Sequence, residues 1–151
     1  MDINIEIIPE YKIAYMRKVG PYGLENVQVM EQLKSWATEN SLFNERSIIL
    51  GIAQDNPGIT EPADCRYDAC LVVSEQFHFE SNNINVGKTM GGKYCVFKIN
   101  HTVDAIQKAW IEIFSELSKR NYKIDDKRKI IERYTMQMIS NHYCEICVPI
   151  L

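Results

Sequence analysis

Hydrophobic and polar residues alternate in several short stretches of the chain, as expected for β-strands with one buried face. The chain opens with this pattern at Ile3, Ile5 and Ile7 and continues it beyond Pro9, so we predict a strand or a bent pair of strands. Further strands are predicted over the ranges 47–53, 66–73, 93–99, 130–138 and 142–149.

Two other stretches place hydrophobic residues every three or four positions, which is typical of amphipathic helices. The first helix is predicted from Leu24 to about residue 40, with a stripe that includes Met30, Leu33 and Trp36. The second is predicted to begin after Thr102, whose side chain can cap it. Its stripe consists of Ile106, Ala109, Trp110, Ile113, Phe114 and Leu117.

A strand–helix–strand–strand order therefore occurs twice, over about 1–80 and 81–151. A shift of 80 residues pairs Met30 with Trp110 and Leu33 with Ile113, although few residues are identical between the halves. We predict a single α+β domain over 1–151, in which two β-α-β-β units share one antiparallel sheet. Both main helices are expected on one face, which leaves the other face for a ligand groove.

Composition and charge narrow the class of protein. The chain has 46% hydrophobic and 25% charged residues and a net charge of −3, so it lacks the basic surface expected of a DNA-binding domain. No signal peptide or apolar run of membrane-spanning length is visible. An odd number of cysteines, five, indicates reduced thiols and a cytoplasmic location.

The closing strand carries the main candidate for chemistry, Glu145. Alternation along this strand sends Ile146 and Val148 to one face and Tyr143, Glu145 and Cys147 to the other. A carboxylate on such an apolar strand needs a partner, because an unpaired buried charge is costly. That partner is either a ligand or a protein cation, and Arg133, Lys98 and Arg66 are the candidate cations.

Aromatic residues offer walls for a pocket around such a carboxylate. The candidates are Tyr15, Tyr67, Trp110, Tyr134 and Tyr143. Trp110 also lies on the stripe of a helix, where packing in the core is the alternative role.

Metal and cofactor chemistry is not indicated. Cys144 and Cys147 have metal-like spacing, but residues three apart on a strand face opposite sides. We therefore expect small core residues there, with no metal and no cofactor.

An ordered set of motifs resembles the GyrI-like family, also called the bacterial transcription-activator effector-binding domain. The motifs are VGPY at 19–22, Trp36, GI at 51–52, DNP at 55–57, CRYDA at 65–69, GGKY at 91–94, Trp110, Tyr134 and EICVPI at 145–150. The resemblance implies a duplicated β-α-β-β fold with a central groove, in which a glutamate of the closing strand meets cationic or electrophilic ligands among aromatic rings. That position matches Glu145.

The resemblance also implies three functions between which the residues do not decide. The first is a stand-alone protein that binds a small aromatic or cationic ligand, linked to transcription regulation or to drug and toxin resistance, without direct DNA binding. The second is a hydrolase of cyclopropane-type electrophilic toxins, with Glu145 as the catalytic base. The third is an interaction module with a protein partner, a regulator or DNA gyrase, through an acidic surface that includes Glu25 and Glu31.

Overall fold

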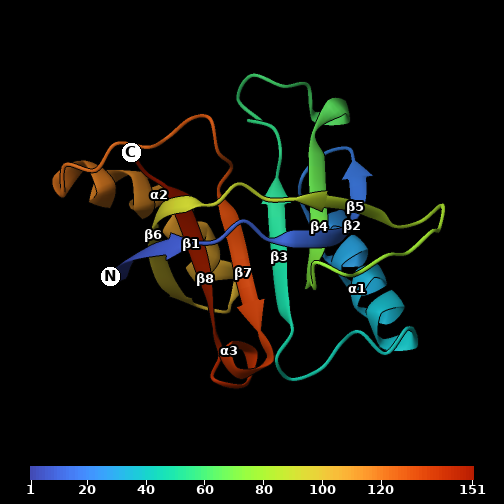
Figure 1. Ribbon diagram of the computed structural model, residues 1–151. Coiled ribbons are helices and arrows are strands. Elements are labelled where there is room, and N and C mark those ends of the chain that lie inside the picture. Colours follow the sequence, from blue (N-terminus) through green and yellow to red (C-terminus); the bar gives the residue numbers. More distant parts are fainter.

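All eight strands belong to one antiparallel sheet in the computed structural model, which describes residues 1–151 (Figure 1). Along the sheet the order is β1-β6-β8-β7-β3-β4-β2-β5. The strands are β1 (Asp2–Ile8), β2 (Lys12–Val19), β3 (Ile48–Ala53), β4 (Arg66–Val73), β5 (Asn85–Lys88), β6 (Gly92–Asn100), β7 (Ile131–Thr135) and β8 (Tyr143–Pro149). The helices are α1 (Leu24–Glu39), α2 (Val103–Lys119) and the short α3 (Met136–Ser140), with one 3-10 turn at Pro62–Asp64.

The predicted α+β architecture is confirmed: one antiparallel sheet carries two main helices on one face. Thr102 caps α2 as expected, because its hydroxyl oxygen accepts a hydrogen bond from the backbone N–H of Ala105 at 3.1 Å. The predicted strand over 130–138 was wrong at its end. Thr135 caps the short helix α3 by accepting from the N–H of Met138, so β7 stops there.

The two β-α-β-β units exchange their flanking strands. One unit is β2-α1-β3-β4 and the other is β6-α2-β7-β8. Strand β1 precedes the first unit but pairs with β6 of the second, and β5 precedes the second unit but pairs with β2 of the first. Each half of the sheet is therefore completed by a strand from the other half of the chain.

Short links force the sheet to curl. Strands β1 and β2 lie towards opposite ends of the sheet, yet only residues 9–11 join them, and only residues 89–91 join β5 to β6. The two links lie side by side, because Tyr11 and Thr89 exchange hydrogen bonds of 2.9 and 3.0 Å. Both links pass over the face of the sheet that lies opposite the helices (Figure 1).

The curled sheet buries core residues on both faces. On the helix face, α1 packs on β2 and β4 around Leu33 and Leu71, and α2 packs around Ile113 and Ile146. The opposite face encloses a third cluster. Its buried members are Ile8, Ile13, Leu50, Ile52, Cys70, Tyr94, Val96, Ile131 and Cys147.

The crossing of the links predicts that Gly91 tolerates no larger residue. A Cβ atom there would lie 2.7 Å from the backbone nitrogen of Glu10 and 3.0 Å from the carbonyl oxygen of Ile8. We expect Gly91→Ala to lower the free energy of unfolding by about 2 kcal/mol in urea denaturation, because backbone must move. Gly58→Ala, in an exposed turn, is the control and should change it far less. Equal effects of the two substitutions would show that the links have room to separate.

Candidate functional site

A cavity of about 670 Å³ opens between the N-terminal halves of α1 and α2, and we call it the groove. Its floor is built from β4 and β7, which present Tyr67, Glu132 and Tyr134 towards the helices. The remaining lining residues are Gly23, Leu24, Asn26, Val27, Met30, Glu31, Lys34, His101, Thr102, Val103, Ile106, Gln107 and Ile139. The groove was predicted on the face away from the helices, and the structure places it between them instead.

Glu132 is the carboxylate of the groove floor. The hydroxyl of Tyr134, two residues along β7 and therefore on the same face, donates a hydrogen bond to its Oε2 atom. The other oxygen, Oε1, makes no hydrogen bond within the protein. Burial raises the pKa of Glu132 above its ordinary value, while the hydrogen bond from Tyr134 acts in the opposite direction. The floor of the groove therefore holds one carboxylate, Glu132, with an unoccupied acceptor.

A glycine allows the ring of Tyr67 to reach this carboxylate. Gly51 of β3 lies between Ala69 of β4 and Glu132 of β7 in the sheet register. A Cβ atom at Gly51 would collide with the hydroxyl of Tyr67, so the ring lies across the strand where a side chain is missing. Burial and the nearby Glu132 raise the pKa values of Tyr67 and Tyr134, and both remain neutral phenols.

The mouth of the groove is apolar and partly aromatic. Leu24, Val27 and Val103 line it and are 76%, 56% and 71% exposed. His101 lies at the rim with its ring 5.5 Å from that of Tyr134, at an interplanar angle of 71°. Hydrophobic side chains left in water around a cavity favour an apolar ligand.

Two of the six predicted site residues, Tyr67 and Tyr134, line the groove. Trp110 is partly buried against the core beneath α2, one turn beyond Ile106 of the groove wall. Tyr15 lines a smaller cavity on the opposite face of the sheet, and Tyr143 lies under the ammonium of Lys98, 4.3 Å from its ring centroid.

Glu145 does not line the groove. Alternation along β8 turns it away from the helix face that Ile146 occupies. There the guanidinium of Arg133 donates from Nε to Glu145 Oε1 at 2.9 Å and from both terminal nitrogens to Glu6, at 3.1 and 2.8 Å. The protein cation that pairs with Glu145 is thus Arg133, one of the three candidates. The carboxylate that lies in the floor of the groove is Glu132. The signal for Glu132 was its spacing of two from Tyr134.

The five cysteines are buried free thiols. Cys144 packs beneath α2, whereas Cys147 faces the opposite side of the sheet with Tyr94. Burial raises the pKa of each of these two thiols to about 12. Cys144 and Cys147 therefore do not form a shared pair, and both remain protonated.

The fold and the groove agree with one protein family. The family model described as the GyrI-like small molecule binding domain matches residues 1–151, and the chain belongs to this family. It is 48% identical over 151 residues to YosT of Bacillus subtilis (strain 168), an SPbeta prophage-derived protein named as a transcriptional regulator. That match covers 99% of both chains. It is 26% identical to DNA gyrase inhibitor 2 of Dickeya dadantii (strain 3937), over 82% of this chain and 78% of that protein.

Solved structures share the fold at low sequence identity. The C-terminal domain of EcmrR superposes with a TM-score of 0.74 and 13% identity, covering 99% of this chain and 97% of that one. In the EcmrR–DNA complex this chain corresponds to 57% of the EcmrR chain. A protein solved with bound tetraphenylphosphonium superposes with a TM-score of 0.63 and 14% identity, over 100% of this chain and 94% of that one.

None of the helices here has the length and hydropathy needed to cross a bilayer.

The ion pairs of Arg133 predict a structural role for that residue. Its side chain is 9% exposed, so Arg133→Ala would leave Glu145, itself 17% exposed, without its cation. We expect a loss of about 3 kcal/mol in the free energy of unfolding. Arg46→Ala serves as the control, because Arg46 is exposed and forms no ion pair, and it should cost less than about 0.5 kcal/mol. A loss as small as that of the control would mean that water replaces the guanidinium without penalty.

The raised pKa of Glu132 predicts a pH-dependent stability. Folding favours its neutral form, so the native state loses stability as pH rises from the ordinary value of 4.5 through the raised folded pKa. Glu132→Gln lacks this ionisation. As pH rises above 4.5, the variant should therefore gain stability relative to the unmodified protein, measured by urea denaturation.

Glu112→Gln, on the exposed surface of α2, is the matched control and should show no such trend. A difference between Glu132→Gln and the unmodified protein that stays constant with pH would refute the ionisation cost.

Proposed function

We propose that this protein binds a small aromatic or lipophilic cation in the groove, with Glu132 as the counter-charge. The observation that carries the proposal is the free Oε1 oxygen of Glu132 beneath an apolar mouth. A cation entering the groove would supply the partner that this carboxylate lacks in the protein. That pairing would offset the free-energy cost of removing the cation and the carboxylate from water.

The aromatic rings of the floor fit the same ligand class. Tyr67 and Tyr134 remain neutral, and the electron-rich faces of such rings attract cations. The one cation at the rim, Lys34, lies 3.8 Å from Glu31, so its charge is compensated. The cavity of about 670 Å³ lies within the range typical of drug-sized ligands.

The names of similar proteins support this proposal. One structural neighbour was solved with tetraphenylphosphonium, a bulky aromatic cation, and the relative with 48% identity is named as a transcriptional regulator. We infer that ligand binding here serves transcription regulation or resistance to a drug or toxin. Binding to a protein partner, a regulator or DNA gyrase, stays a prediction.

Tetraphenylphosphonium is the probe for the groove, with titration calorimetry as the measurement. We expect Glu132→Gln to weaken its binding at least ten-fold, which corresponds to about 1.4 kcal/mol. The matched control is Glu145→Gln, which makes the same chemical change on the opposite face and should leave the affinity within two-fold. If Glu145→Gln weakened binding and Glu132→Gln did not, the site would lie on the opposite face of the sheet.

Acid should also weaken binding to the unmodified protein. Protonation removes the negative charge of Glu132 as pH falls through its raised pKa, and the variant Glu132→Gln should bind equally at all pH values in this range.

A hydrolase acting on electrophiles is the second candidate, with Glu132 rather than Glu145 as its catalytic base. A half-buried carboxylate with a raised pKa and a free oxygen can act as a general base on water. Incubation with a cyclopropane-bearing electrophile followed by mass analysis separates the two functions. A product that gains one water, and is not formed by Glu132→Gln, indicates turnover, whereas an unchanged compound indicates binding alone.

A further inference from the structure

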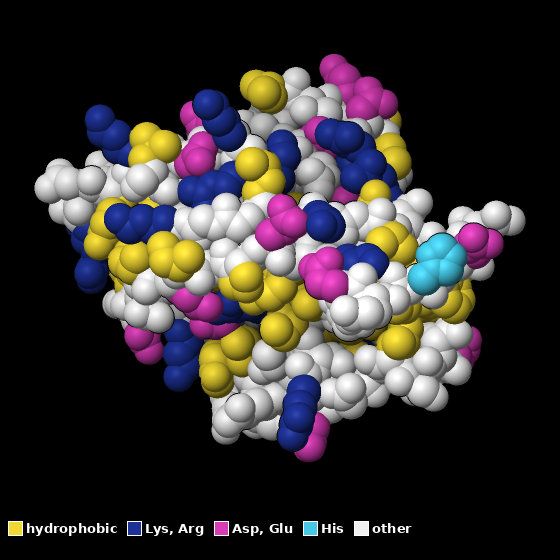
Figure 2. All heavy atoms as spheres, in the orientation of Figure 1, with side chains coloured by type: hydrophobic (Ala, Val, Ile, Leu, Met, Phe, Trp, Pro, Cys, Tyr) yellow, Lys and Arg dark blue, Asp and Glu magenta, His cyan; other side chains and the backbone are white.

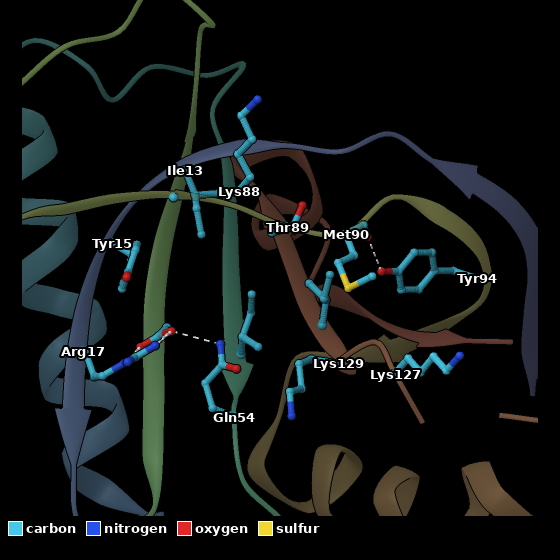
Figure 3. Close-up of a pocket in the computed structure, with 14 residues that line it drawn as sticks. Ile13, Tyr15, Arg17, Gln54, Lys88, Thr89, Met90, Tyr94, Lys127 and Lys129 are labelled. Atoms are coloured by element: carbon cyan, nitrogen blue, oxygen red, sulfur yellow. Dashed lines mark hydrogen bonds and ion pairs between the residues drawn. The ribbon is translucent and has the colours of Figure 1, made fainter. Parts of the chain in front are cut away.

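A second cavity lies on the face of the sheet opposite the groove. It has a volume of about 290 Å³ and lies beneath the 89–91 link, between β2 and β3 on one side and the loop before β7 on the other (Figure 3). We call it the rear cavity. Its floor is apolar, since Ile13, Ile52 and Ile131 are each 95% or more buried.

Lysines dominate the rim of the rear cavity. Lys127 and Lys129 approach from the loop before β7, and Lys88 lies at the edge formed by β5 (Figure 3). Lys127 and Lys129 form no ion pair, and Lys88 has only the exposed Glu10, 3.4 Å away. Figure 2 shows Lys and Arg side chains over the upper part of the same face.

The one acidic residue that lines the rear cavity, Asp68, is already paired. Arg17 holds Asp68 through two hydrogen bonds of 2.7 and 2.9 Å, and Gln54 donates a third to the same carboxylate. Asp55, which interacts with Lys129 through space, accepts hydrogen bonds from two nitrogens of the Arg66 guanidinium, Nε and Nη2. The rear cavity therefore carries a net positive charge in a protein whose overall net charge is −3.

We propose that the rear cavity is a second binding site, for a small organic anion with an apolar body, such as an aromatic carboxylate or phosphate ester. The unpaired ammonium groups of Lys127 and Lys129 attract the anion as point charges, and the isoleucine floor receives the apolar part. The rear cavity is small and closed at its base by apolar side chains. This shape favours such a molecule over the backbone of a nucleic acid, which needs an open basic surface.

The two sites share strands but differ in charge. On β7, Ile131 faces the rear cavity while Glu132 faces the groove. On β4, Asp68 faces the rear cavity while Tyr67 faces the groove. Neighbouring residues of a strand point to opposite faces, so the rear site differs from the groove in position and in ligand preference.

The experiment is a titration of ¹⁵N-labelled protein with phenyl phosphate, benzoate, inorganic phosphate and a short DNA duplex, followed by amide chemical shifts. We expect phenyl phosphate or benzoate to move the amide signals of residues 88–90 and 127–131, while those of 101–107 in the groove stay in place. Which anion binds more tightly distinguishes a phosphate ester from a carboxylate. Binding should weaken as salt is added, because the charges are exposed.

The double substitution Lys127→Glu with Lys129→Glu should weaken binding at least ten-fold. The matched control is Lys108→Glu with Lys119→Glu, which changes the net charge equally on α2 and should keep the affinity within two-fold. Glu132→Gln should also bind the anion normally, so this test is independent of the groove. The dispersion of the amide signals shows whether each variant is folded.

Four results with the small anions would overturn the proposal. These are the absence of shifts at millimolar concentrations, shifts spread over the whole surface, equal loss in the control variant, and inorganic phosphate binding as tightly as phenyl phosphate. The last would mean that the isoleucine floor contributes nothing. Tighter binding of the DNA duplex to the same lysines would likewise replace this site by a nucleic-acid surface.

Discussion

The two short links between the ends of the sheet are the constraint on which the rest of the structure depends. In a flat sheet, β1 and β2 would lie six strand spacings apart, about 28 Å, as would β5 and β6, and three-residue connections cannot span that distance. The sheet must therefore curl, and Gly91 makes the close crossing of the links possible. Curling gives the sheet one face that carries helices and one face that encloses its own core.

The groove exists because two helices cover that first face only partly. Each helix packs on the strands of its own unit, and the junction of the units, where β3 meets β7, lies between them. Gly51 and Glu132 face each other at this junction, which gives space for the ring of Tyr67 and a carboxylate in the floor. The buried carboxylate opposes folding and favours a cationic ligand, a conflict common at binding sites.

Most of the fold could be predicted because its elements follow their periodicity. The stripe from Leu24 and the cap at Thr102 located both helices, and β4 was predicted with its observed bounds. Strand β5 was missed, because its four residues are mostly exposed and only long-range pairing with β2 makes them a strand.

The site was harder to predict than the fold, since it depends on which strands become neighbours. Alternation correctly separated Glu145 from Ile146, but it cannot say which face carries a cavity. Arg133 is among the cations that the sequence offers to Glu145. That Arg133 also binds Glu6, from the other end of the chain, follows only from the pairing of β1 with β6. Glu132 shares the face of Tyr134, and that spacing was the available clue.

The burial of every thiol has a chemical consequence for reactive molecules that enter the groove. Alkylation and oxidation of cysteine proceed through the thiolate, and burial raises the pKa of the Cys144 and Cys147 thiols to about 12, so both stay protonated. No cysteine lines the groove, so an electrophilic or oxidising molecule there would meet side chains such as Met30 and His101 instead.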